Sequence, residues 1–316
     1  MESKDFFLVL GTVALAIALV VLPGAAKAEM YVEGYVGGVF GSNTSMTAGS
    51  GGVSTPTVAP FGGPHFTFVP PGTANSFLAP NAVSSFATKI RGSFAPNVIG
   101  GLKVGTWFVK EGFLKYDYPT WMKYLGFYLD FSYSRLNFTE TKNGTRVVYN
   151  ETSSGGPVFA GTTTSSFFSE GMAPTLAFMF TGRYGFLQDD EVPFGRLQPY
   201  IGVGPAILFA SQKPKIIYSP HTTLATDGTG RTLTNPNFTG VAPGDSGSTV
   251  IALAVDAGVR YMMLKNVSLD VSFKYRYAQP SFHYSFTDPF SGNPNSFTLK
   301  PTYNLFSGQV GVAYHF

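Results

Sequence analysis

The stretch NVSLDVSFKYRY, from Asn266 to Tyr277, decides the fold class of this chain. From Val267 onward every second residue is apolar or aromatic. The residues between them are Ser268, Asp270, Ser272, Lys274 and Arg276. This period of two predicts a β-strand with one apolar face and one ionised face, because successive side chains of a strand point to opposite sides. A soluble sandwich buries the apolar face, whereas a membrane barrel turns it toward lipid and lines its lumen with the polar face.

The composition favours the second arrangement. Charged residues make up 12% of the chain, about half the usual share, while aromatic residues make up 16%. The chain has no cysteine, which excludes disulfides, thiol chemistry and a cysteine metal site. The formal net charge of +3 is small and scattered, so nothing indicates binding of nucleic acid.

The N-terminus has the pattern of an export signal. An apolar run from Phe6 to Leu22 is followed by Pro23-Gly24 and then by Ala26-Lys27-Ala28, a small-x-small site. We therefore expect residues 1–28 to be a signal peptide that is cleaved before Glu29; the alternative is a retained anchor helix. After residue 28 no apolar stretch is long enough for a spanning helix, so a membrane-embedded mature chain must cross the bilayer as strands.

The two-residue period recurs in eight segments along the chain. They are residues 30–40, 97–108, 125–134, 173–184, 199–209, 250–262, 266–277 and 303–316. Long connections rich in Gly, Ser, Thr, Pro and Asn alternate with shorter ones, as in a barrel with both termini in the periplasm. Residues 29–316 are therefore predicted to form one all-β domain, an eight-stranded antiparallel up-and-down transmembrane β-barrel with long extracellular loops.

The shortest connection, Leu264 to Asn266, predicts the register of the last hairpin. As a three-residue loop with Asn266 in the left-handed conformation, it places Arg260 opposite Asp270 and Asp256 opposite Lys274. Two pairs of opposite charge then meet on the lumen side, which favours this register over its neighbours.

The charged residues of the eight segments fall on the face opposite the apolar one. They are Glu33, Lys103, Asp130, Arg183, Asp256, Arg260, Asp270, Lys274 and Arg276. An eight-stranded barrel is just wide enough for side chains to fill it, so we expect these residues to form a plug of paired charges rather than a pore. The alternative is that they lie on the wet outside of a soluble sandwich.

Four short motifs carry a resemblance to a known family: YVEGYVGGVF near the start, GGLKVGTWF, PYIGVG, and the ending VGVAYHF. With them the chain resembles the OmpA-like and OmpW-like eight-stranded β-barrels of Gram-negative outer membranes. The resemblance implies residence in the outer membrane among its lipid and lipopolysaccharide, and folding by the barrel-assembly machinery. It also implies that Val310, Val312, Tyr314 and Phe316 form the C-terminal signal which that machinery recognises.

Residues capable of catalysis or metal binding are few. His65 and His221 lie in Pro/Gly-rich loops without a nearby carboxylate, and His315 is expected to point inward as a lumen filler. His283 and Ser285 share a face, and lipid A deacylase barrels resemble this His-x-Ser pair. However, Phe286 stands where that family has Asn, and Asp288 is the only nearby acid. We therefore expect no enzyme activity, no cofactor and no metal.

The sequence favours an integral outer-membrane barrel that stabilises the envelope and presents its loops, possible sites for an unknown ligand, at the surface. Two alternatives remain open. One is a channel for small hydrophobic or minor solutes, for which aromatic loop clusters such as HFTFV and SSFF would supply either extra strands or a hydrophobic gate. The more remote one is a lipid A hydrolase.

Overall fold

The computed structural model describes most of the chain after the predicted signal peptide. The described ranges are 29–41, 44–49, 67–69, 87–109, 118–150, 158–218, 223–224, 232–234, 243–287 and 294–316. Side chains are described for most of these positions. Within these ranges no helix combines the length and the hydropathy needed to cross a bilayer. The prediction for residues 1–28 falls outside the described residues and stays a prediction.

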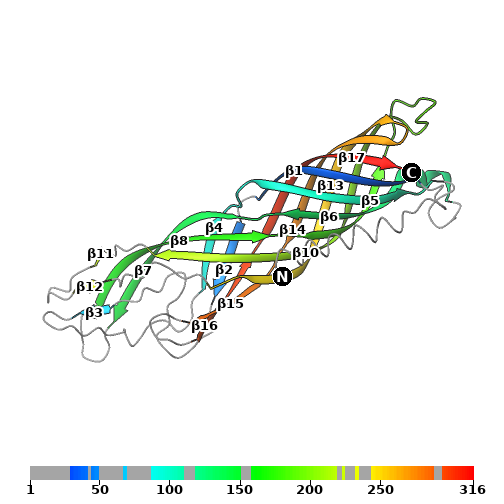
Figure 1. Cartoon of the computed structure of the whole chain (residues 1–316). Coiled ribbons are helices and arrows are strands. Elements are labelled where there is room, and N and C mark those ends of the chain that lie inside the picture. The colour runs from blue at the N-terminus through cyan, green and yellow to red at the C-terminus, as the bar shows by residue number, and fades with distance from the viewer. Residues whose placement is uncertain are drawn as a thin grey trace.

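Eight antiparallel strands form a closed ring (Figure 1). They are β1 (Glu29–Gly41), β5 (Asn97–Trp107), β6 (Leu125–Ser134), β9 (Thr175–Arg183), β10 (Leu197–Tyr218), β13 (Ser246–Leu264), β14 (Val267–Ala278) and β17 (Tyr303–His315). Each of the eight pairs with the next in chain order, and β17 pairs with β1 to close the ring. All eight predicted segments are confirmed as strands, and closure leaves the ring without a free edge within the membrane.

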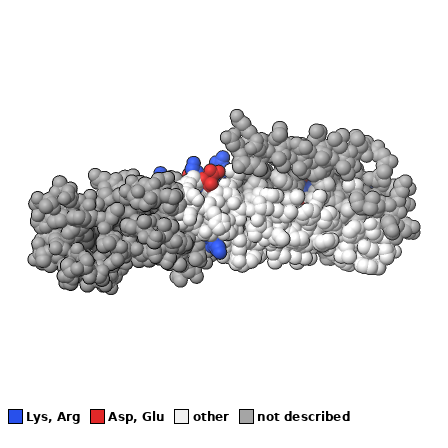
Figure 2. Space-filling model, turned by 90° about the horizontal axis from the view of Figure 1, so that it is seen from below, with Lys and Arg blue, Asp and Glu red and all other residues white. Residues whose placement is uncertain are grey.

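The orientation of the strands answers the question raised by NVSLDVSFKYRY. Along β14, Asp270, Lys274 and Arg276 are buried, while Leu269, Val271 and Phe273 are exposed on the outside. The same alternation holds in the neighbouring strands, so the apolar face forms the outer wall. Figure 2 shows this wall as a white band with few charged atoms, and most of the charged side chains visible there lie toward its left end. A soluble sandwich is excluded, because its apolar faces would be buried.

The register of the β13–β14 hairpin is the predicted one. Arg260 pairs with Asp270 and Asp256 pairs with Lys274. The turn itself differs from the prediction. A register shift falls between Met262 and Leu264, and Leu187 is the one non-glycine residue with positive φ in the described part of the chain, so Asn266 is not left-handed. The turn consists of Lys265 and Asn266, and a bulge at Met263 accommodates the extra residue of β13, so the connection is not a three-residue loop.

The long connections contain more regular structure than the prediction of loops implied. The additional strands are β2 (Thr44–Gly49), β3 (Thr67–Val69), β4 (Ala87–Gly92), β7 (Phe138–Asn150), β8 (Val158–Met172), β11 (Thr223–Leu224), β12 (Thr232–Thr234), β15 (Phe282–Thr287) and β16 (Pro294–Pro301). A short 3₁₀ helix, Thr120–Tyr124, precedes β6. Both aromatic clusters contribute to strands: HFTFV contains β3 and SSFF lies in β8.

Several of these strands continue the barrel wall beyond the membrane band. β10 exchanges its partner β9 for β8 after Leu208, and β7 pairs with β8 on the other side. The strands β15, β16, β2 and β4 pair in that order to form a second piece of wall. In Figure 1 both pieces extend from the same end of the barrel, the extracellular end. β10 has 22 residues, about twice the length that a transmembrane strand needs.

Candidate functional site

The barrel interior holds all nine charged residues that the sequence predicts there. Each of them is at most 4% exposed. Eight form one network near the middle of the lumen: Glu33, Lys103, Asp130, Asp256, Arg260, Asp270, Lys274 and Arg276. Four are acidic and four are basic, so the network is electrically neutral when all are ionised. We call these eight residues the lumen network.

Lys103 contacts three of the four acids of this network. Its Nζ lies 2.8 Å from Glu33 Oε1, 3.6 Å from Asp270 Oδ1 and 3.7 Å from Asp256 Oδ2. The same nitrogen lies 5.2 to 5.9 Å from the ring centres of three tyrosines, Tyr35, Tyr128 and Tyr200. A buried ammonium is costly unless it is paired and hydrogen-bonded, and this arrangement surrounds it with both carboxylates and ring faces.

The other cations pair across the lumen as well as with their strand neighbours. Lys274 donates to Asp130 on β6, while its register partner Asp256 is 3.9 Å away. Arg260 donates to Glu33 Oε2 on β1 at 2.7 Å and lies 3.5 Å from its register partner Asp270. The closest partners thus differ from those that the hairpin register suggested, because long side chains reach past the adjacent strand to the far wall.

Tyrosine hydroxyl groups supply the remaining hydrogen bonds to the aspartates. Tyr35 donates to Asp130 at 2.6 Å and Tyr128 donates to Asp256 at 2.6 Å. Tyr200 donates to Asp270 at 2.9 Å. The sequence pattern did not single out these tyrosines as network members. The two-residue period does place Tyr35 on the face of Glu33 and Tyr128 on the face of Asp130. Hydrogen bonds to a charged group contribute about 1.5–3 kcal/mol each, so the tyrosines belong to the network energetically.

Arg183 stands apart from the lumen network at the periplasmic end. It makes a two-pronged ion pair with Glu29, at 2.7 and 2.5 Å, and donates to Gln198 at 3.0 Å. Its guanidinium lies between the rings of Trp107 and Phe194, at 4.0 and 4.1 Å from their centres. The sequence did not indicate that Glu29, which directly follows the predicted cleavage site, is the partner of Arg183.

His315 also points inward at this end, as expected of a lumen filler. Its Nε2 lies 2.8 Å from Ser268 Oγ, and its ring packs beside Tyr31. Together with the Arg183 cluster it fills the periplasmic mouth of the barrel.

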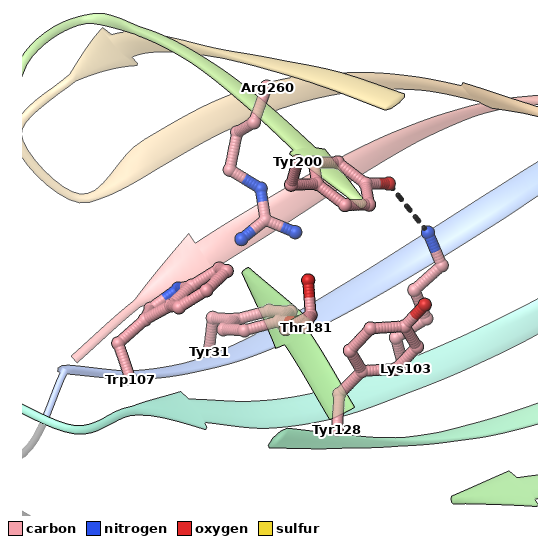
Figure 3. Close-up of a pocket in the computed structure, with 7 residues that line it drawn as sticks. All are labelled: Tyr31, Lys103, Trp107, Tyr128, Thr181, Tyr200 and Arg260. Atoms are coloured by element: carbon pink, nitrogen blue, oxygen red, sulfur yellow. Dashed lines mark hydrogen bonds between the residues drawn. The ribbon is translucent and has the colours of Figure 1, made fainter. Parts of the chain in front are cut away.

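The space between these side chains is small. The gap lined by Tyr31, Lys103, Trp107, Tyr128, Thr181, Tyr200 and Arg260 has no room for a water-sized sphere (Figure 3). Glycines allow this close packing. A methyl group added at Gly105 would lie 2.7 Å from both Tyr128 and Tyr31, and one at Gly258 would lie 2.7 Å from the ring of Tyr200.

Above the lumen network the interior becomes apolar. Phe94 packs edge-on against Phe138 and Tyr303, and Phe138 packs against Phe167. Tyr284 and Phe297 stack beside them, with Gln212 donating to the Tyr303 hydroxyl at 2.9 Å. We call this region the aromatic layer. The extramembrane strands thus enclose a second, apolar core on top of the ionic one.

The remaining candidate residues are placed as follows. Val310, Val312, Tyr314 and Phe316 all face outward on β17 and beyond its end, with half of each side chain exposed. His283 Nδ1 lies 2.9 Å from Thr298 Oγ1 on the paired strand. His65, His221 and Asp288 lie outside the described residues. No group of three or more acidic or histidine side chains in the described ranges is arranged to hold a metal.

The geometry defines the class of protein. A closed ring of eight antiparallel strands pairs each strand with two neighbours, turns an apolar surface outward and places ionic groups inside. The chain is an integral outer-membrane β-barrel.

The chain is similar to the outer membrane protein OprG from Pseudomonas aeruginosa, with 13% identity and a TM-score of 0.38 over 93% of this chain and 98% of that one. It is also similar to Neisserial surface protein A, with 11% identity and a TM-score of 0.28 over 92% and 100% of the two chains. The outer membrane protease OmpT from Escherichia coli matches at 9% identity and a TM-score of 0.29, over 90% and 97%. No family model and no curated protein matches the sequence.

Proposed function

We propose that this protein is a non-enzymatic, non-conducting barrel that stabilises the outer membrane and presents its extramembrane strands at the cell surface. The observation that carries the proposal is the lumen network, in which eight buried charges balance and the gap around Lys103 has no room for water. An ion crossing the barrel would have to displace several mutually paired groups, each of which is costly to leave unpaired.

Conductance in a planar bilayer tests this function. The wild-type barrel is expected to give no current steps. The double variant Tyr128→Ala with Tyr200→Ala removes two rings from the narrowest part of the lumen and is expected to produce leakage. Tyr261→Ala with Tyr314→Ala removes two rings from the outer wall and serves as the matched control, expected to stay closed. Regular current steps in the wild type would contradict the plug.

A lateral channel for small apolar solutes is the second candidate, and one observation favours it. The β13–β14 ladder ends at Leu253 and Tyr277, although β13 stays paired with β10 up to Ser246. Above this point the described residues join the two sides through serine side chains: Ser281 and His283 donate their backbone N–H groups to the Ser248 and Ser246 hydroxyls, at 3.1 and 3.2 Å. We call this interruption the seam.

A disulfide across the seam separates the two candidates. The chain has no cysteine, so Ser248→Cys with Ser281→Cys introduces the only possible crosslink. If the seam conducts, liposome uptake of a small apolar dye should fall on oxidation and recover on reduction. A purely structural barrel should show the same uptake as empty liposomes in both states.

The proposal assigns no catalysis to His283. Its ring nitrogen is engaged by Thr298 rather than by Ser285. Lipid A extracted from cells that express the wild type and His283→Ala is therefore expected to have the same mass spectrum. A loss of acyl chains that depends on His283 would instead support the hydrolase alternative.

A further inference from the structure

A groove of about 620 Å³ crosses the outer wall beside the seam. It is lined by Gly204 and Pro205 of β10, by residues 250–253 of β13, and by residues 277–279 at the end of β14. Ile251, Leu253 and Tyr277 are among the exposed apolar side chains of the barrel. Its surface is therefore apolar, with the Gln279 amide and the Tyr277 hydroxyl at its rim, joined by a hydrogen bond of 2.5 Å.

The depth of the groove follows from the course of β10. Pro205 lies on the apolar wall, and Lys213, eight residues further along β10, is the first outward cation of that strand. At about 3.3 Å per residue and a tilt of about 40°, this distance corresponds to roughly 20 Å along the membrane normal. One leaflet consists of about 15 Å of hydrocarbon below a polar layer of roughly 5–7 Å. If Lys213 lies at the level of the headgroups, Pro205 lies near the middle of the bilayer, and the groove extends through the hydrocarbon of the outer leaflet.

Charges at the upper end of this wall suit an anionic headgroup. Arg135, Lys213, Lys215 and Lys300 are exposed there, against two carboxylates, Glu170 and Asp245, which leaves two excess positive charges among the described side chains. At the periplasmic rim the exposed or half-buried bases Lys123, Arg196 and Lys265 are balanced by three acids, Asp189, Asp190 and Glu191. Cations near phosphate add roughly 1 kcal/mol each, so they orient a lipid more than they hold it.

The seam adds polar groups beside the groove. Between Ala252 and Ser248 the β13 backbone pairs with β10 on one side, while the β14 ladder has already ended on the other side. At the upper end of this segment the Ser248 and Ser246 hydroxyls accept hydrogen bonds from the Ser281 and His283 backbone N–H groups. A ligand with carbonyl and hydroxyl groups at the top of its acyl chains would place polar groups next to these polar side chains.

We propose that the groove binds an acyl chain of lipid A, with the phosphorylated headgroup at Lys213 and Lys215. Lipid A fits each observation: it belongs to the outer leaflet, its phosphates match the cations, and its hydroxyacyl chains carry polar groups toward the end of the groove where the Ser246 and Ser248 hydroxyls lie. The bound lipid covers the seam from the membrane side. The same barrel wall outside the groove, for example around Val271, lacks both the hollow and the cations.

Matched variants in detergent-purified barrel test this site. Leu253→Trp fills the groove, whereas Val271→Trp adds the same ring to the flat wall; the two residues are 49% and 53% exposed. Native mass spectrometry with added lipid A should show tenfold weaker retention for Leu253→Trp and no change for Val271→Trp. Heat-modified gel mobility confirms that both variants are folded.

The headgroup contact is tested with a second pair. Lys213→Ala should weaken retention of lipid A several-fold without affecting phosphatidylethanolamine of the same acyl length, and Lys265→Ala at the periplasmic rim should leave both unchanged. Equal retention of lipid A by Leu253→Trp and wild type would overturn the site. If both lipids bind equally and their retention does not depend on Lys213, lipid A is not the occupant of the groove.

Discussion

Replacing Asp130 by Ala tests the lumen network at one of its three fully buried acids. Asp130 is 0% exposed and contacts three partners: Lys274, the Tyr35 hydroxyl at 2.6 Å, and Arg276 at 3.8 Å. Without it the eight-residue network carries one excess positive charge, and Lys274 keeps only Asp256, at 3.9 Å, as an acidic partner. Removing one member of a buried ion pair costs about 3–5 kcal/mol, so the variant should lose that much stability.

Urea titrations of the barrel folded in lipid vesicles measure this loss. The double variant Asp130→Ala with Lys274→Met removes the stranded ammonium together with its partner. Its loss should fall short of the sum of the two single losses by about 1–3 kcal/mol, because the paired groups are coupled. Ser272→Ala, a small change at a buried lumen position, is the control and should cost about 1 kcal/mol or less. Additive losses, or a loss for Asp130→Ala no larger than for Ser272→Ala, would refute the pairing across the lumen.

Three further predictions follow from the wall, the lumen and the periplasmic loop. Val271→Arg should destabilise the barrel by about 2–4 kcal/mol in lipid vesicles, because Val271 faces hydrocarbon, whereas Val271→Leu should be nearly neutral; equal effects would mean that the wall is not in lipid. Gly105→Ala should cost about 1–3 kcal/mol by crowding tyrosine rings, while Gly34→Ala, with open space around it, should not; urea titration distinguishes them. The hydrogen bond from Arg196 lowers the pKa of Asp189 below its usual value of 3.8, so the loop contact is fully present above pH 3.8 and is lost as the pH falls through the lowered pKa. The protection factor of the Val192 amide, which donates to Asp189 at 2.7 Å, should fall with it, and Asp189→Asn should remove this change in protection.

Ser272→Arg is not a suitable control for Val271→Arg. Ser272→Arg would be a natural partner for Val271→Arg, since the two positions differ only in the face they occupy. In the folded barrel, however, Ser272 is buried at 5% exposure among the side chains that fill the lumen, so an arginine there would have to displace its neighbours. Overfilling would obscure the comparison, which is why leucine at 271 is the better reference.

The sequence by itself determined the number of strands, their inward and outward faces and the register of the β13–β14 hairpin. These features depend on local rules: side chains alternate along a strand, and residues paired across two strands lie on the same face of the sheet. The sequence therefore predicted that Asp256 pairs with Lys274, as it does in the barrel. The same alternation places Tyr35 and Tyr128 on the charged face, beside Glu33 and Asp130.

The tertiary structure decided which charges meet. Lys274 bonds Asp130 and Arg260 bonds Glu33, pairs that lie 144 and 227 residues apart in the chain. Such contacts depend on the stagger of the closed ring, which sets the height at which opposite walls face each other, and no single segment encodes it. The extramembrane strands and the seam depend on tertiary structure for the same reason. Their pairing joins connections that the chain separates widely, so only closure of the barrel brings them together.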